Sequence, residues 1–501
     1  MEHQFQELKD RLAEVYDLSA AAAVLGWDMQ TYMPPGGVQS RAEQLATLQR
    51  LSHEKLTSDE IGRLLQDLRP YEASLSYDSN EASLIRVTRR EYERHRRLPA
   101  DFVRRMAETG AMSYQTWVEA RPESDWARTE SWLERILELS REYSSYFPDK
   151  QHVADPLIDI VDPGMTAAEL KRTFAELRAA LVPIVRAITA FPPADDSCLR
   201  QHFSGPTQLD LSQKIVAQLG YDFKRGRQDL TAHPFMTQFS IDDVRITTRV
   251  DENYLGQTLF SSIHESGHAM YGQGIDHGLA RTLLADGASS GAHESQSRLW
   301  ENQVGRSRGF WTYFYPRLQE TFPSQLGQVP LETFYRAVNK VEQSLIRTEA
   351  DEVTYNLHIM LRFDLELDML EGKLAVHDLP EAWNERFKQD MGLTPPDYSS
   401  GPMQDIHWFG GQIGGVFQGY TLGNIMGAQF FDAAQHAHPE IPDQIAHGQF
   451  STLLGWLQDN VYKHGAKFTP PELMQRATGG PISIAPYLHY LRTKFGELYP
   501  L

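Results

Sequence analysis

The chain has 501 residues, of which 41% are apolar and 11% aromatic, so it can bury a large core and is not typical of a disordered protein. Its formal net charge is −19, from 67 acidic and 48 basic residues, which argues against binding to nucleic acid or an anionic membrane. Cys198 is the single cysteine, and the longest apolar stretch, residues 20–27, is too short to cross a bilayer. We therefore expect a cytoplasmic protein without a membrane anchor.

Apolar residues recur at helical spacing in most of the chain. Two clear series are Leu8, Leu12, Val15 and Tyr16, and Leu170, Phe174, Leu177, Leu181 and Ile184. The second series begins with Thr166 and Glu169, a capping-box pattern just after the turn Asp162-Pro163-Gly164. Pro183 should kink or end that helix.

One pair of segments has the alternating pattern of β-strands. Residues 235–240 and 244–250 flank a turn near Asp242-Asp243. No turn-forming cluster is long enough to be an interdomain linker, and the sequence has no internal repeat. We therefore expect a mainly α fold in one domain, residues 1–501, with a small antiparallel sheet just before the segment described next.

The segment from Leu255 to Tyr271 is helical in pattern and contains the motif His264-Glu265-Ser266-Gly267-His268. Four residues advance a helix by slightly more than one turn, so both imidazoles leave the same face and can bind one tetrahedral zinc ion. Glu265 lies at the flank, where a carboxylate can act as general base toward a water molecule. The alternative is a pair of histidines that bind no metal.

Catalytic zinc needs a third protein ligand and an open fourth position. Glu294 is the candidate, because it lies 26 residues after His268 in a second helical segment that can return against the first. From the residues alone, His293 in the same segment is a rival, and Glu294 could equally be a surface residue.

Several short motifs resemble those of the carboxypeptidase Taq family of zinc metallocarboxypeptidases. In chain order they are His233-Pro234-Phe235, Asp243 to Thr247, His264 to His268, His293 to Gln296, Ile346 to Asp351 and Gly401 to Trp408. Six motifs in the family's order make the resemblance specific, and it covers most of the chain.

This resemblance implies that Glu294 is the third zinc ligand and that His293 supports the site without binding the ion. It also implies a large, saddle-like helical body around a deep groove, a homodimer, and release of C-terminal amino acids from peptides with broad specificity. We expect one zinc ion per chain, for which Co²⁺ or Mn²⁺ can substitute.

Four further residues are candidates for roles around the zinc. Arg347 could bind the substrate's terminal carboxylate and Arg245 could organise the substrate-binding edge, because the planar guanidinium bonds both carboxylate oxygens. His407 and Tyr420 could stabilise the oxyanion of the tetrahedral intermediate. Each has a structural alternative: a buried ion pair for either arginine, a packed core residue for His407 and a helix-start residue for Tyr420.

The sequence thus predicts a zinc carboxypeptidase in which Glu265 activates water for attack on the last peptide bond. One alternative is an endo-acting zinc oligopeptidase with a groove open at both ends. Another is a binding protein in which the metal only braces two helices, although a base beside an open coordination position argues against it.

Overall fold

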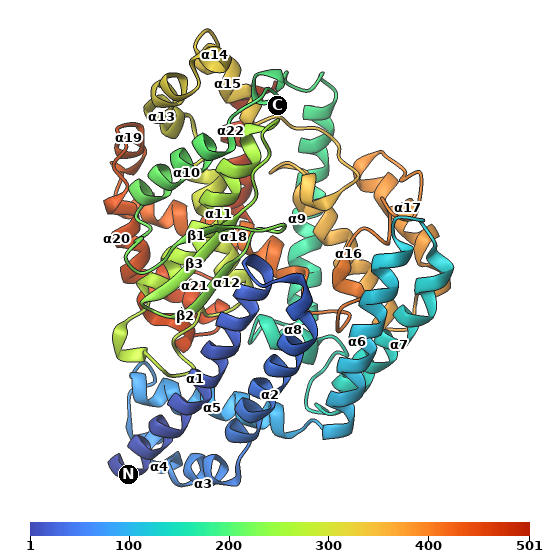
Figure 1. Ribbon diagram of the computed structural model, residues 1–501, viewed down its shortest axis with the longest axis vertical. Coiled ribbons are helices and arrows are strands. Elements are labelled where there is room, and N and C mark those ends of the chain that lie inside the picture. The colour runs from blue at the N-terminus through green and yellow to red at the C-terminus, as the bar shows by residue number, and fades with distance from the viewer. Residues whose placement is uncertain (501) are drawn as a thin grey trace.

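The computed structural model describes residues 1–500, and helices make up most of it (Figure 1). The part before the sheet contains α1 (Glu2–Thr31), α2 (Val38–Leu56), α3 (Asp59–Asp67), α4 (Arg69–Ser74), α5 (Asn80–Arg96), α6 (Ala100–Ala120), α7 (Trp126–Ser145), α8 (Asp155–Val161), α9 (Ala167–Thr189) and α10 (Gly205–Leu219). The prediction of a mainly α fold is confirmed.

The sheet consists of β1 (Gln228–Leu230), β2 (Met236–Ser240) and β3 (Asp243–Thr248). It is followed by α11 (Leu255–Gly274), α12 (Ser290–Arg298), α13 (Arg308–Thr321), α14 (Pro323–Leu326), α15 (Leu331–Val338), α16 (Tyr355–Leu370), α17 (Leu379–Met391), α18 (Gln418–Ala437), α19 (Ile441–Ala446), α20 (Ser451–Asn460), α21 (Pro470–Thr478) and α22 (Ala485–Leu498). A π-helix, Leu299–Val304, continues α12 directly.

The sheet has the strand order β1-β3-β2. β2 and β3 pair antiparallel, with Met236 opposite Ile246, as their alternating pattern predicted. The expectation of a wholly antiparallel sheet was wrong, because β1 pairs with β3 in parallel, Gln228 lying opposite Ile246. β1 is only three residues long, and its two buried residues, Gln228 and Asp229, are polar. It therefore lacks the apolar alternation by which a strand is recognised.

Helix α9 shows where local propensity and packing disagree. Its N-cap, Thr166, accepts a hydrogen bond from the backbone of Glu169, as the capping pattern predicted. The helix does not end at Pro183 but continues to Thr189. Proline inside a helix costs about 3 kcal/mol, and the burial of Val185 and Ile188, each 1% exposed, contributes about 1.5–3 kcal/mol per side chain. Packing thus offsets the lost backbone hydrogen bond.

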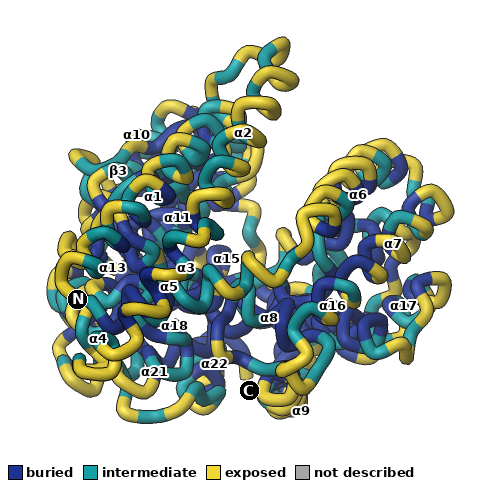
Figure 2. Tube along the Cα trace, turned by 90° about the horizontal axis from the view of Figure 1, so that it is seen from below, coloured by how far each residue is buried: buried dark blue, intermediate teal, exposed yellow. Residues whose placement is uncertain are grey.

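The helices form two arms, so that the trace has the expected saddle-like outline (Figure 2). In that view α1 and α2 lie in one arm with α11 and the sheet, and α6, α7 and α17 lie in the other. The main apolar core includes residues of α7, α9, α11, α16 and α18. A second cluster joins α1, α3 and α5 to the loop after α11, through Ile275, Leu279 and Leu284. Among residues 1–500, no helix is both long and apolar enough to cross a membrane.

Candidate metal centre

Helix α11 carries the first two candidate ligands. Ile263 and the apolar residues one and two turns before it face the core and are at most 3% exposed. His264 follows Ile263 directly and His268 lies one turn later; both are half-buried, and their ring centroids lie 5.1 Å apart. The helical spacing therefore places both imidazoles on one face, as predicted.

Helix α12 brings Glu294 to these histidines. Oε2 of Glu294 lies 3.5 Å from Nε2 of His264 and 3.3 Å from Nε2 of His268, and the three ligand atoms lie within 4.8 Å of one another. Around a tetrahedral zinc ion with bonds of about 2.0–2.1 Å, neighbouring ligand atoms are about 3.4 Å apart. The three side chains thus have the spacing that one zinc-sized ion requires, and their chemistry, two imidazoles and a carboxylate, suits it.

Two glycines allow α12 to lie so close to its neighbours. A Cβ atom on Gly267 of α11 would lie 2.6 Å from the carbonyl oxygen of Gln296. A Cβ atom on Gly423 of α18 would lie 2.5 Å from Cγ of Glu294 itself. Carbon atoms normally approach no closer than about 3.5 Å, so only glycine fits at either position. The backbones of α11 and α18 therefore hold the carboxylate ligand from two sides.

A charged network surrounds the ligands. Arg298 donates from Nε to Oε1 of Glu294 (2.7 Å) and from Nη1 to Glu301 (3.2 Å). Glu301 in turn lies 2.9 Å from Nδ1 of His264, and Ser297 donates to Oε2 of Glu294 (2.9 Å). Burial alone would raise the pKa of both glutamates, but Arg298 and His264 hold both pKa values below the usual range. The carboxylates therefore stay ionised, as metal binding requires.

Sequence reasoning missed Arg298 and Glu301. A helical signal was present, because they follow Glu294 by four and seven residues and so return to its face after one and two turns. Glu301 lies in the π-helix, whose wider turn disturbs the regular spacing. Carboxylates that bond the second nitrogen of a metal-binding histidine fix its tautomer and orientation, and Glu301 has this position toward His264.

His293, the rival ligand, lies outside the three-atom cluster. Its Nδ1 is 3.1 Å from Nδ1 of His268, and its ring lies 4.9 Å from that of Tyr271. Burial and the neighbouring His268 lower the pKa of His293 to about 3, so it stays neutral near pH 7. A neutral imidazole can orient His268 through this contact.

Glu265 is 7% exposed and follows His264 directly on α11, at the flank of the face that carries the two histidines. Burial raises the pKa of its carboxyl, while the charges of His264 and His268 act in the opposite direction. No protein group among residues 1–500 donates a hydrogen bond to it at normal distance. Its oxygens are therefore available to accept a hydrogen bond from water, which a general base must do.

His407 and Tyr420 contact each other. The Tyr420 hydroxyl lies 3.3 Å from Nε2 of His407, and Nδ1 of His407 lies 3.3 Å from the carboxylate of Asp405. Burial raises the pKa of Tyr420 above its usual value, with a further contribution from the nearby carboxylate of Glu294. Tyr420 therefore keeps its proton and can donate a hydrogen bond.

Both motif arginines form ion pairs. Arg347 is 7% exposed and donates from Nε and Nη2 to Asp405, and from Nη1 to the hydroxyl of Tyr355 (3.2 Å). Arg245, on β3, pairs with Asp243 at 2.8 Å, and its guanidinium lies 4.5 Å from the ring of Trp27 in α1. Each arginine thus forms the ion pair that is the structural alternative to binding substrate. Arg245 also connects the sheet to the N-terminal arm through its contact with Trp27.

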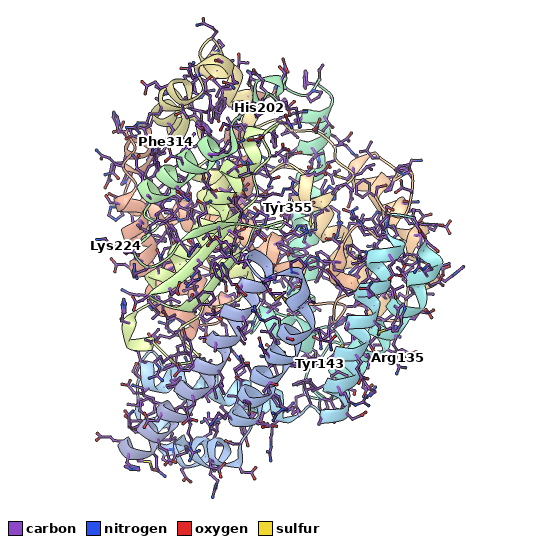
Figure 3. The ribbon with its side chains drawn as sticks, viewed as in Figure 1. Arg135, Tyr143, His202, Lys224, Phe314 and Tyr355 are labelled. Carbon is purple, nitrogen blue, oxygen red and sulfur yellow. The ribbon has the colours of Figure 1, made fainter. Side chains whose placement is uncertain are left out.

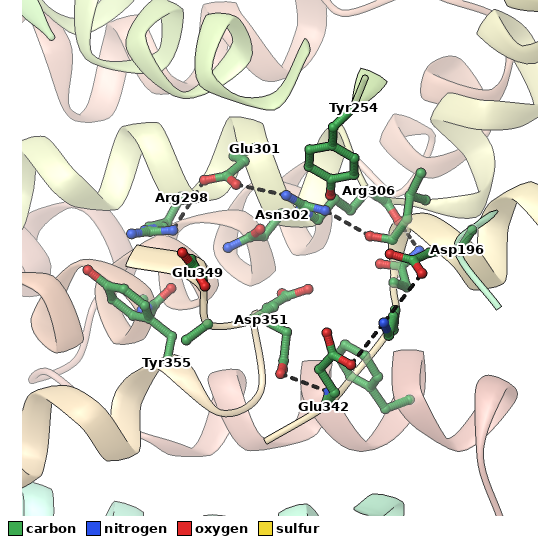
Figure 4. Close-up of a pocket in the computed structure, with 18 of the residues that line it drawn as sticks. Asp196, Tyr254, Arg298, Glu301, Asn302, Arg306, Glu342, Glu349, Asp351 and Tyr355 are labelled. Carbon is green, nitrogen blue, oxygen red and sulfur yellow. Dashed lines mark hydrogen bonds and ion pairs between the residues drawn. The ribbon is translucent and has the colours of Figure 1, made fainter. Parts of the chain in front are cut away.

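A polar cavity of about 150 Å³ adjoins the network (Figure 4). Arg298 and Glu301 line one wall, and Glu349, Asp351 and Tyr355 line the opposite wall. The guanidinium of Arg298 lies 4.4 Å from the ring of Tyr355, near the middle of the molecule (Figure 3). Arg298, which bonds the candidate metal ligand Glu294, therefore forms part of the cavity wall.

Comparison with known proteins supports the same assignment. The family model of the carboxypeptidase Taq (M32) metallopeptidases matches residues 7–495. The chain is 40% identical to thermostable carboxypeptidase 1 of Thermus thermophilus and 36% identical to carboxypeptidase 1 of Bacillus subtilis, each over 99% of both chains. It resembles the crystal structure of the M32 carboxypeptidase of Deinococcus radiodurans with a TM-score of 0.97, at 47% identity over all of both chains. The chain therefore belongs to the carboxypeptidase Taq family of metallopeptidases, which are peptide hydrolases.

Proposed function

We propose that the protein is a zinc carboxypeptidase that removes C-terminal amino acids from peptides. The observation that carries this proposal is the convergence of His264, His268 and Glu294 at the spacing of one tetrahedral ion, with Glu265 unbonded beside them. Zinc bound there supplies Lewis acidity, which polarises a peptide carbonyl and makes water more acidic. We expect one zinc ion per chain, replaceable by Co²⁺ or Mn²⁺.

Glu265 is the general base in this proposal. It takes a proton from the attacking water and then passes it to the leaving amine, so that one carboxylate serves both steps. Burial raises its pKa while His264 and His268 act in the opposite direction, and the carboxylate that takes the proton from water is the group that returns it to the amine. Tyr420 and His407 lie together and donate hydrogen bonds to the oxyanion of the tetrahedral intermediate.

The substrate's terminal carboxylate requires a cationic partner, and we propose Arg347. Its Nη1 donates to the hydroxyl of Tyr355, so a substrate carboxylate bound beside Tyr355 would replace that hydroxyl as acceptor. Charge-assisted hydrogen bonds contribute about 1.5–3 kcal/mol, so Arg347→Ala should raise KM by about 10–100-fold. Arg245 would act indirectly, by holding α1 against the sheet at the substrate-binding edge.

The decisive experiment uses one peptide with a free C-terminus and the same peptide amidated. Mass spectrometry should show a ladder of products shortened from the C-terminus for the free peptide and no cleavage of the amidated one. Varying the last residue tests the proposed broad specificity. Internal cleavage of both peptides would instead identify an endopeptidase, and metal analysis of the same sample gives the ion and its ratio to the chain.

We further propose that the protein acts in the cytoplasm as a homodimer. The family resemblance supports the dimer, and the single cysteine, Cys198, which is buried, fits a reducing compartment. Light scattering coupled to size-exclusion chromatography would give the mass, which should be twice 57.1 kDa. A single-chain mass at micromolar concentration would contradict the dimer.

A further inference from the structure

One buried carboxylate outside the metal centre joins the two helices that carry Glu294 and Tyr420. Asp162, at the end of α8, is fully buried. Its Oδ1 accepts a hydrogen bond from the backbone N–H of Gly291 (2.8 Å), and its Oδ2 accepts one from Nε2 of Gln418 (2.9 Å). Gly291 is the second residue of α12, and Gln418 is the first residue of α18.

The position of Asp162 suits a negative charge. The first N–H groups of a helix lack intrahelical acceptors and carry the positive end of the helix dipole, and this carboxylate lies at two such ends. Burial raises the pKa of Asp162, while the bonds from Gly291 and Gln418 lower it. Gly291 precedes Glu294 by three residues and Gln418 precedes Tyr420 by two, so each bond acts within one turn of a site residue.

We propose that Asp162 is a positioning residue, which fixes the start of α18 against the start of α12 and thereby sets the place of Tyr420 relative to the metal ligands. This inference rests on the role proposed above for Tyr420. Where α12 and α18 touch, Gly419 and Gly423 of α18 bring the backbones together but offer no side chain that could lock their register. The two bonds to Asp162 supply that restraint.

The metal ligands have supports other than this contact. Glu294 accepts bonds from Arg298 and Ser297 and meets α18 at Gly423, one turn beyond the start of that helix. His264 and His268 lie on α11, which meets α12 through Gly267 and Gln296, away from Asp162. Loss of the Asp162 bonds should therefore displace Tyr420 while the ion stays bound. We therefore expect a loss of kcat without a matching loss of zinc affinity.

The test is a double-mutant cycle of Asp162→Asn with Tyr420→Phe in the metal-loaded full-length protein. Misplacement of a catalytic group by about 1 Å can reduce the rate by about 100-fold, so D162N should lower kcat by about 10–100-fold and change KM little. In the Y420F background, D162N should change kcat by less than about 2-fold, because the hydroxyl that it misplaces is absent. The dissociation constant of zinc, measured by chelator competition, should stay within about 2-fold of the wild-type value.

Asp155→Asn is the matched control. Asp155 is the first residue of α8, the helix that Asp162 follows directly, and is 4% exposed. Like Asp162 it accepts two hydrogen bonds, here from the backbone N–H groups of Ala167 (2.8 Å) and His152 (3.0 Å). It contacts neither α12 nor α18 through these bonds, so D155N should lower Tm without a Tyr420-dependent loss of kcat. If D162N fails to fold, Gln418→Met keeps the Gly291 bond but removes the α18 bond, together with the bond from Gln418 to the carbonyl oxygen of Gly415 (2.7 Å), and should give the same cycle.

An equal loss of kcat from D162N in both backgrounds would overturn the positioning role, as would a parallel loss of zinc affinity. If Y420F turns over like wild type, the proposed role of Tyr420 fails, and the crystal structure of D162N then decides on Asp162. A shifted start of α18 would support the positioning role, and Tyr420 unmoved beside His407 would overturn it.

Discussion

Gly423→Ala tests whether the close approach of α18 determines the geometry of the metal site. The added Cβ would lie 2.5 Å from Cγ and 2.7 Å from Cβ of Glu294. Because carbon atoms normally stay at least about 3.5 Å apart, one of the two helices must move by about 1 Å. Metal–ligand distances tolerate only about 0.2 Å. We therefore expect zinc affinity to fall at least about 10–100-fold, the loss typical of disturbed supporting contacts.

The assay is zinc competition against a chelator of known affinity, with kcat measured at saturating zinc. Gly455→Ala, in α20, is the control, because a Cβ there meets nothing within 4 Å and the change should stabilise the fold by about 0.5–1 kcal/mol. If G423A bound zinc as tightly as wild type and turned over peptide normally, the argument from close packing would be refuted. If zinc affinity were kept but kcat fell, α18 would have moved instead of α12.

Three further predictions concern single carboxylates. Glu265→Gln should keep zinc but lose turnover by at least about 100–10,000-fold, because the amide cannot accept a proton; metal analysis and peptide hydrolysis test this, and substantial activity would contradict the mechanism. Glu301→Gln should weaken zinc binding by about 10–100-fold through His264, and an unchanged affinity would show that the contact is unimportant. Burial raises the pKa of Glu366, whose carboxyl accepts a hydrogen bond from Trp408, from 4.5 to about 7. The folded state therefore binds this proton more tightly than the unfolded chain, and the free energy of unfolding should fall by about 3 kcal/mol as the pH rises from about 4.5 to 7. Urea denaturation at several pH values should show that Glu366→Gln flattens this fall, and equal pH dependence in both proteins would contradict it.

The parts of the site that follow from local geometry could be predicted from the sequence. The pairing of His264 with His268 requires only that the segment be helical, because the helix fixes the angle between residues four apart. The helix itself was visible from its apolar stripe, which the structure buries at Ile263 and its neighbours. The convergence of Glu294 depends on a contact between residues 26 positions apart, and helical pattern alone could not choose it over His293. Resemblance to a family resolved that choice.

Other features could not be predicted because their cause is not local. Strand β1 exists through its pairing with β3, and its own residues carry no strand pattern. Pro183 stays within α9 because of apolar burial on both sides, which outweighs the local penalty. Arg347 is a candidate from the sequence because its planar guanidinium can bond both oxygens of a carboxylate. In the folded chain, the carboxylate that it bonds is that of Asp405, 58 residues away, and no local pattern predicts that pairing.

Glycine inside a helix was the signal that could have revealed the architecture of the site. In a helix interior, glycine costs about 1 kcal/mol relative to alanine, so Gly267 between the two histidines and Gly423 in α18 need a compensating reason. The structure supplies it, because both lie where a Cβ would collide with α12. Apolar periodicity shows which side of a helix faces the core, whereas these glycines show where another backbone comes closest. A metal centre built from two helices depends on where the two backbones come closest. The ligand atoms must meet within a few tenths of an ångström, and the loop that joins the helices does not impose such a distance.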